Sequence, residues 1–327
     1  MATTTRKQTS KEVIEILLKP PHLFGALALL CILAASFYFT MRYLEREQMP
    51  VPVQVAAAST TIDAFAGISL QARSAIVYDI STGKTLYERN ADTELPLASI
   101  TKVMLALVVA ESMPPETVIT IPYDTAPAGA PQRLRQGEKW EVGKVINFTL
   151  VSSSNKGADI LASAANEWVR ARFVGAPAQH ATLWRMNELA KEIGMTKAQF
   201  SNASGLDIST SESGGYASAR DVAKLFTYAA SSSLHVFSAT AENGVLLSDE
   251  GGHQAQATNT NEALGDIPGL IMGKTGLTDL AGGNLAVVYD VGLAHPVVAV
   301  VLGSTRAGRF EDMRKLVPAS RTAVTAQ

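Results

Sequence analysis

The sequence predicts an α+β fold: an antiparallel sheet flanked by helices with an inserted helical lobe, preceded by an N-terminal transmembrane helix. Two observations predict the domain: strand patterns occur near both ends of residues 62–327, and helical patterns fill the region between them. Strands from both ends that share one sheet leave the intervening helices as a separate lobe. A long uncharged apolar run before the domain predicts the membrane helix.

The elements of the domain follow in order. Residues 74–80 (SAIVYDI) and 84–90 (KTLYERN) alternate around the turn STG, which is typical of a hairpin. Apolar residues then recur with helical spacing. We expect helices at about 99–112, 141–152, 156–172, 178–193 and 218–230.

The later part of the domain contains a loop, three strands and a closing helix. Residues 195–217 are rich in Gly, Ser and Asn and predict a long irregular loop, a feature that is usually functional inside a compact domain. Strands are expected at about 269–275, 283–291 and 295–303, and an amphipathic helix near 307–317.

The N-terminal apolar run has the length of a membrane span. No charge lies between Lys19 and Arg42, and residues 23–39 (LFGALALLCILAASFYF) are almost wholly apolar. A helix needs about 20 such residues to cross a bilayer. Because a signal peptide has a shorter apolar core of about 7–15 residues, an uncleaved anchor at 21–41 is favoured over a cleaved signal.

The basic residues around this run predict its orientation. Four precede it and two follow closely, so the positive-inside rule places residues 1–20 in the cytoplasm and the domain outside. Residues 42–61 contain two prolines and small residues and predict a linker, and residues 62–327 predict one domain. The expected location is the cell membrane, with one span and an extracytoplasmic domain.

The composition of the chain excludes several kinds of partner and catalytic group. The 327 residues are 47% hydrophobic and carry a formal net charge of -2, which gives no indication of a nucleic-acid partner. The single cysteine, Cys31, lies in the apolar run, so the domain has no disulfide and no cysteine nucleophile. The five histidines show no ligand spacing, so we expect no metal and no cofactor.

A Ser-x-x-Lys pattern occurs three times, at Ser81, Ser99 and Ser153. Only Ser99 and Lys102 are followed by an unbroken apolar helix pattern, VMLALVVA. Residues three apart share one helix face, so the lysine nitrogen can reach the serine hydroxyl. A serine cap with a lysine that extends to solvent is the structural alternative.

Two further motifs favour catalysis. Ser153-x-Asn155 is the only Ser-x-Asn in the chain, and residues 274–276 are the only Lys-Thr-Gly. Ser-x-x-Lys, a Ser-x-Asn-type element and Lys-Thr-Gly occur in this order in penicillin-binding proteins and class A β-lactamases.

Longer stretches resemble one family of these proteins over roughly residues 70–320. They are IVYDISTGKTLYERNADTELPLASITKVM, VSSSNKGADILA, FSNASGLD, SARDVAKL and GKTGLTDLAGGNLA. The chain resembles the D-alanyl-D-alanine carboxypeptidases, low-molecular-mass penicillin-binding proteins of serine peptidase family S11. The resemblance implies a β-lactamase/transpeptidase-like fold. The chain departs from the family's pattern at Lys156, at Leu277 and in GYASARD.

The resemblance implies a role for each motif residue. Ser99 attacks the carbonyl between two D-alanines, and Lys102, kept neutral by burial and by the nearby Lys274, takes its proton. Ser153 passes a proton to the leaving amine, and Asn155 binds the substrate amide.

The remaining implied residues bind the substrate. Lys274 and Thr275 hold the terminal carboxylate, and Gly276 lets the substrate lie against its strand. The backbone N–H groups of Ser99 and Leu277 form the oxyanion hole. Arg220 is expected to support the site from behind, or to form a surface ion pair with Asp221, and Arg306 is a further candidate for the carboxylate.

The implied substrate is a peptidoglycan stem peptide that ends in D-Ala-D-Ala, with β-lactam antibiotics as covalent inhibitors. A β-lactamase on the same fold is an alternative, but Glu212, the one glutamate in the loop, lies in a Ser/Gly run that predicts solvation. An inactive wall-binding or scaffold homologue is another. The sequence does not separate a carboxypeptidase from an endopeptidase.

Overall fold

The computed structural model describes residues 20–47, 63–122, 134–232 and 236–326. The chain divides into two units, Met1–Thr60 and Thr61–Gln327. In the first, α2 (Pro20–Glu47) extends beyond the predicted span 21–41, and its segment Leu27–Leu44 is long and apolar enough to cross a membrane. A signal sequence has the same character. Residues 1–19 and 48–61 of the predicted cytoplasmic segment and linker lie outside the described residues.

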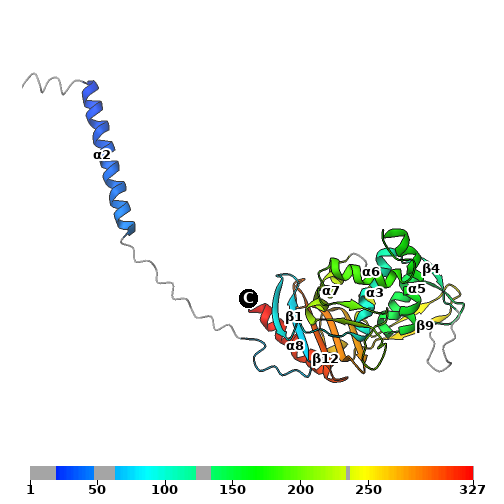
Figure 1. Cartoon of the computed structure of the whole chain (residues 1–327). Helices are drawn as coiled ribbons and strands as arrows, with labels where there is room; N and C mark the ends of the chain where they lie inside the picture. Colours follow the sequence, from blue (N-terminus) through cyan, green and yellow to red (C-terminus); the bar gives the residue numbers. More distant parts are fainter. Residues whose placement is uncertain (1–19, 48–62, 123–133, 233–235, 327) are drawn as a thin grey trace, which may run out of the picture. The chain divides into compact units, whose positions relative to one another are not determined.

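The second unit is built on a five-stranded antiparallel sheet in the order β10-β11-β12-β1-β2 (Figure 1). Strands β1 and β2 come from the start of the unit and the other three from its end, as the sequence predicted. Their bounds are β1 Ser74–Asp79, β2 Lys84–Arg89, β10 Leu270–Thr278, β11 Gly282–Asp290 and β12 Pro296–Ser304.

Both faces of the sheet are buried, which explains why β11 and β12 read as continuous apolar runs. Odd-numbered residues such as Leu285 and Val287 pack with α8 (Gly308–Thr325), whereas Ala286 and Val288 belong to the core on the other side. Helix α7 (Ala219–Ser231) covers that second face (Figure 1). The sheet is therefore the middle layer between helices.

The inserted lobe is made of helices that pack around one buried helix, α3 (Thr101–Ser112). The surrounding helices are α4 (Val142–Ser152), α5 (Asn155–Arg172) and α6 (Ala181–Glu192). Residues 101–109 of α3 are all buried, and α4, α5 and α6 contact it. A helix that is apolar on every side belongs in a core. The first turn of α3, which carries Lys102, is thus held from several directions.

Several elements were not predicted, and most of them have only two or three residues, too few for a periodic pattern. The expected loop 195–217 contains β6 (Gln199–Phe200) and β7 (Gly215–Ala217), which form a three-stranded sheet with β3 (Leu95–Pro96). The other unpredicted strands form two hairpins. They are β4 (Val118–Thr120) with β5 (Lys139–Glu141), and β8 (Gly244–Ser248) with β9 (Gln254–Thr258).

The closing helix is longer than expected. Helix α8 continues through Pro318 to Thr325, although the pattern predicted an end near 317. Its last turns are retained because Ala319 and Ser320 are buried, and Ser320 Oγ hydrogen-bonds to the hydroxyl of Tyr289 on β11. Tertiary packing here outweighs the local cost of proline.

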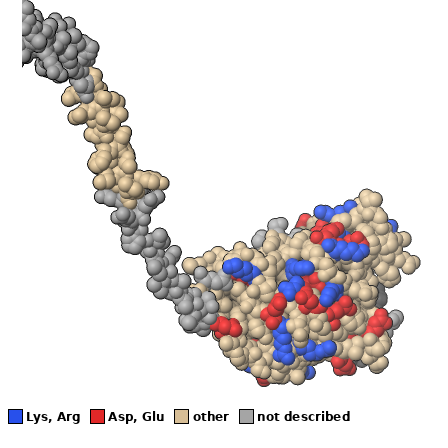
Figure 2. All heavy atoms as spheres, turned by 60° about the vertical axis from the view of Figure 1, so that its left-hand side comes forward, with Lys and Arg blue, Asp and Glu red and all other residues tan. Residues whose placement is uncertain are grey.

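Basic and acidic side chains are interspersed on the face of the second unit that Figure 2 shows. Such mixing is the ordinary pattern of a solvated surface.

Candidate active site

Ser99 lies in a short 3-10 turn, η1 (Ala98–Ile100), which leads directly into α3. Ala98 has a φ of +49°, a left-handed conformation that is rare for a residue with a side chain. Strained backbone of this kind persists only where the surroundings fix it, and it is common at functional sites. The turn leaves Ser99 half-buried at the N-terminal end of the core helix.

Lys102 is fully buried, and its Nζ has three hydrogen-bond partners. They are Ser99 Oγ at 2.8 Å, Asn155 Oδ1 at 2.8 Å and the Ser204 carbonyl oxygen at 2.7 Å. The last two only accept hydrogen bonds, and a neutral amine has two N–H groups and one lone pair. The lone pair of neutral Lys102 must therefore face Ser99 Oγ, whose proton it then accepts.

Burial also favours the neutral amine. Desolvation lowers the pKa of Lys102 to about 7, while the negative charge of Asp159 acts in the opposite direction. A lysine base needs a pKa near the working pH. The alternative of a lysine that extends to solvent is wrong, because the Lys102 side chain is enclosed.

Ser153 and Asn155 flank the junction of α4 and α5. Ser153 follows α4 with φ 58° and ψ 34°, the left-handed conformation that ends the helix. The side chain of Ser154 then caps α5 by accepting a hydrogen bond from the Gly157 N–H at 3.0 Å. This stop and restart place Ser153 toward β10 and Asn155 toward Lys102.

Lys274 on β10 completes the cluster. Its buried Nζ donates hydrogen bonds to Ser153 Oγ at 2.9 Å and to the Thr275 carbonyl at 3.0 Å. Burial, and then the positive charges of Lys102 and Arg309, hold the pKa of Lys274 well below its usual value. Two buried amines that repel each other do not both stay charged at neutral pH.

Gly276 allows β10 to approach the nucleophile turn. A Cβ at this position would lie 2.6 Å from the Leu97 carbonyl oxygen and 3.2 Å from Ala98 Cβ. The glycine therefore has a role within the protein, apart from the substrate contact that the resemblance implies. Leu277, the next residue, is exposed.

Arg309 lies behind the same strand and was missed by the sequence analysis. Its Nη1 donates a 2.6 Å hydrogen bond to the Gly276 carbonyl oxygen, and the side chain is buried. That carbonyl and the Leu277 N–H belong to one peptide group. The arginine thus fixes the orientation of the N–H that the resemblance assigns to the oxyanion hole.

The loop 201–214 supplies the third partner of Lys102. Asn202 Oδ1 accepts hydrogen bonds from the N–H groups of Ser204 and Gly205, which shapes the turn that presents the Ser204 carbonyl. Gly205 has a φ of +76°, and a Cβ there would lie only 1.9 Å from the Ala98 carbonyl oxygen. These residues lie in FSNASGLD, one of the stretches that resemble the family, but the sequence analysis gave the Ser204 carbonyl no role.

Gly205→Ala is expected to lower both stability and the reactivity of Ser99, because its methyl group meets backbone rather than a flexible side chain. Gly194→Ala is the matched control, since Gly194 has a φ of +75° with no atom within 4 Å of the added Cβ. The control should lose about 1–2 kcal/mol of unfolding free energy for the left-handed conformation alone. Gly205→Ala should lose more, measured by urea unfolding; equal losses would contradict the close approach.

Comparison with known proteins decides the family. A family model described as D-alanyl-D-alanine carboxypeptidase, peptidase S11, matches residues 57–306. The chain belongs to this family.

This S11 member is similar to two curated relatives and to one solved structure. The chain is 27% identical over 261 residues to D-alanyl-D-alanine carboxypeptidase DacF of Bacillus subtilis, covering 76% of this chain and 61% of that protein. It is 30% identical over 261 residues to a D-alanyl-D-alanine endopeptidase of Pseudomonas aeruginosa, covering 77% and 79%. The chain spans less than two thirds of the Bacillus relative.

The solved structure is penicillin-binding protein D2 of Listeria monocytogenes in its ampicillin-bound form. It has a TM-score of 0.64 and 28% identity, and the match covers 77% of this chain and 98% of that one. The β-lactamase/transpeptidase-like fold that the resemblance implied is confirmed.

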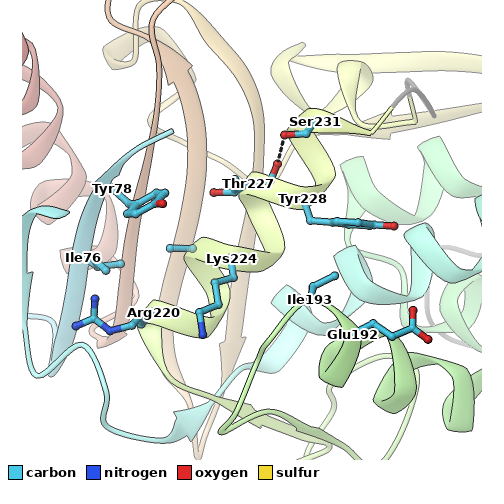
Figure 3. A pocket seen from close by; sticks show the side chains of 10 residues that line it. Ile76, Tyr78, Glu192, Ile193, Arg220, Lys224, Thr227, Tyr228 and Ser231 are labelled. Carbon is cyan, nitrogen blue, oxygen red and sulfur yellow. Dashed lines mark hydrogen bonds between the residues drawn. The ribbon is translucent and has the colours of Figure 1, made fainter. Parts of the chain in front are cut away.

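Among the described residues of this S11 member, the Arg220 side chain hydrogen-bonds to surface carboxylates and to none of the cluster residues. Its guanidinium bonds to Asp92 at 2.8 Å and to Glu88 at 2.6 Å, so its ion pairs are with these residues and not with Asp221. It lines a cavity of about 540 Å³ between β1, α7 and the end of α6 (Figure 3). Arg306 is exposed at the start of the turn into α8.

One histidine lies in a group of potential metal ligands that sequence spacing did not indicate. Ligand atoms of Glu138, Asp249 and His253 lie within 4.8 Å of one another. Asp249 already accepts hydrogen bonds from His253, and Glu138 accepts one from the Trp140 indole. These contacts account for the grouping without an ion.

Proposed function

We propose that residues 61–327 form a serine-type D-Ala-D-Ala carboxypeptidase that removes the terminal D-alanine of peptidoglycan stem peptides. One observation carries the proposal: buried Lys102 Nζ lies 2.8 Å from Ser99 Oγ, and its other two partners can only accept hydrogen bonds. A nucleophile and its base within hydrogen-bond reach define covalent catalysis of this type. The S11 family and its named relatives support the substrate class.

In the acylation step, Ser99 Oγ bonds to the carbonyl carbon of the penultimate D-alanine as its proton moves to Lys102 Nζ. The N–H groups of Ser99 and Leu277 stabilise the oxyanion, and a lost donor of this kind typically costs about 10²–10³ in rate. The C–N bond then breaks, and the leaving amine receives a proton through Ser153. Water hydrolyses the ester, restores the Ser99 hydroxyl and releases the shortened peptide.

Substrate binding also determines which of the two buried lysines, Lys102 or Lys274, is protonated. The terminal carboxylate of the substrate binds at Lys274 and Thr275, which raises the pKa of Lys274 and keeps that amine charged. The positive charge of Lys102 lowers the pKa of Lys274. Because like charges that lie close together oppose each other, a charge on Lys274 in turn disfavours a second charge on Lys102. The same event thus positions the substrate and leaves the base neutral.

β-Lactam antibiotics acylate Ser99 in the same way, and helix α2 anchors the enzyme in the cell membrane with its catalytic unit outside. The ampicillin-bound Listeria relative supports the first statement. The length and composition of Leu27–Leu44 and the preceding basic residues support the second.

The test is intact mass of the full chain in detergent after incubation with benzylpenicillin. The wild type should carry one covalent adduct, and Ser99→Ala none. Ser81→Ala, which changes the exposed Ser-x-x-Lys serine in the hairpin, should react like the wild type. An unmodified wild-type protein with intact drug would favour the inactive scaffold, and destroyed drug without a persistent adduct would favour a β-lactamase.

An endopeptidase that cuts D-Ala crosslinks is the second candidate, because the Pseudomonas relative bears that name at 30% identity. Both reactions use the same acyl-enzyme. Release of free D-alanine from a linear stem peptide supports the carboxypeptidase. Cleavage of a crosslinked dimer without that release supports the endopeptidase.

A further inference from the structure

Asn284, near the start of β11, is fully buried and does not belong to any of the three motifs. Its Nδ2 donates to the Pro96 carbonyl at 2.9 Å and to the Leu97 carbonyl at 3.0 Å. Its Oδ1 accepts from the Gly303 N–H at 2.8 Å. The amide therefore joins two sheet strands to the segment that immediately precedes Ser99.

The Leu97 carbonyl is the point at which this contact acts on the nucleophile. That oxygen also accepts the N–H of Ile100 at 3.3 Å, the hydrogen bond that closes the 3-10 turn around Ser99. Ala98, which joins Leu97 to Ser99, is held in a strained left-handed conformation. The orientation of the Leu97 carbonyl group therefore affects the position of Ser99. A shift of the Leu97 carbonyl is thus transmitted to the Ser99 backbone.

The Leu97 carbonyl also lies against Gly276 on strand β10. Asn284 is the cross-strand partner of Gly276, and the Leu97 oxygen lies where a Gly276 side chain would be, 2.6 Å from its ideal Cβ. The two proposed oxyanion donors lie just beyond this contact in the chain. The Ser99 N–H is two residues after Leu97, and the Leu277 N–H is one residue after Gly276. Asn284 holds the segments together with two N–H donors.

We propose that Asn284 is a positioning residue that sets the separation of the two oxyanion-hole donors. The inference rests on the proposed acyl-transfer function. Asn284 does not touch the substrate; it holds the Leu97 carbonyl against β10, so that the Ser99 and Leu277 N–H groups converge on one oxygen. Preorganised donors lose much of their effect when displaced, and an error of about 1 Å can cost about 100-fold in rate.

Asn284→Asp tests this role because it keeps the side-chain shape and replaces two donors with an oxygen that repels two carbonyls. We expect the maximal acylation rate by benzylpenicillin to fall about 10- to 100-fold, with little change in the concentration that gives half of that rate. When the introduced carboxyl group is protonated, it regains one O–H donor. The ratio of variant to wild-type rate should therefore rise as pH falls, which a merely structural loss would not produce.

Asn187→Asp is the matched control. Asn187 Nδ2 also donates to two carbonyls, of Leu183 and Phe200, and its Oδ1 accepts the Phe200 N–H. This control should lose unfolding free energy without a selective loss of acylation rate. If Asn284→Asp does not fold, Asn284→Ser, which removes the amide without adding charge, is compared with Asn187→Ser in the same assay.

The outcomes separate the two levels of the proposal. Wild-type protein that forms no adduct contradicts the acyl-transfer function itself. A reactive wild type with Asn284 variants that acylate at the rate of the Asn187 controls, or a variant-to-wild-type ratio that is independent of pH, overturns the role of Asn284 alone. A selective, pH-dependent loss of the acylation rate confirms it.

Discussion

Replacing Lys102 with arginine is expected to slow acylation of Ser99 by about 100- to 10 000-fold, the range that a general base contributes. Arginine stays protonated in proteins and cannot accept the Ser99 proton. The planar guanidinium also cannot reproduce the three contacts of Nζ with Ser99, Asn155 and Ser204. The measurement is the time course of the benzylpenicillin adduct by intact mass.

The control for this substitution is Lys144→Arg. Lys144 is partly exposed and pairs with Glu141 on the surface, so its replacement should leave the acylation rate unchanged. Near-normal acylation by Lys102→Arg would rule out the base role. Loss of acylation in both variants would instead indicate a general effect on the protein.

The wild-type acylation rate should rise with pH. Lys102 acts as a base only when neutral, and burial lowers its pKa to about 7. Below about pH 7 the amine is mostly protonated and acylation is slow; above it the rate should approach a plateau. A profile that is flat between about pH 5.5 and 8.5 would contradict the assignment, since no titration of the base would be visible.

Lys274→Met is the second substitution with a large expected effect, a fall of about 100-fold or more in acylation by carboxylate-bearing substrates and β-lactams. The methionine preserves much of the buried volume but cannot bind the carboxylate or Ser153 Oγ, which Lys274 contacts at 2.9 Å. When the substrate carboxylate is bound and keeps Lys274 charged, the substitution also eliminates a positive neighbour of Lys102. The pKa of Lys102 should therefore rise, and the midpoint of the acylation profile should move to higher pH.

Lys315→Met provides the comparison for Lys274→Met, because Lys315 is exposed and donates a hydrogen bond to the Ser69 carbonyl on the surface. It should retain both the rate and the midpoint. A Lys274→Met enzyme with a reduced rate but an unchanged midpoint would separate carboxylate binding from the electrostatic coupling of the two lysines.

The sequence predicted the main elements because their apolar patterns are long enough to show a period. The hairpin of β1 and β2, the core helix α3 and the three C-terminal strands lie close to their expected positions. Strands of two or three residues, such as β3, β6 and β7, have no period to detect. Helix α8 exceeds its prediction because buried Ser320 continues the packing beyond Pro318.

The candidate site was accessible from the sequence only where a side chain belongs to a motif. The structure brings together Ser99, Lys102, Ser153, Asn155 and Lys274, all of which come from the three short patterns. The Ser204 carbonyl, the contact of Arg309 with Gly276 and the bridge made by Asn284 depend on tertiary approach. The sequence does not distinguish a backbone carbonyl or a buried asparagine that supports the site from one that has only a structural role.

The pairing of the first strand with the last one has a consequence for biosynthesis. Ala75 of β1 lies opposite Val301 of β12, so the sheet cannot close until the chain has been made as far as β12. Closing so large a loop loses conformational entropy before any pairing is gained, which slows folding. Lys274 also arrives late, on β10. A nascent chain that has been made only as far as α3 therefore contains Ser99 but not the assembled cluster.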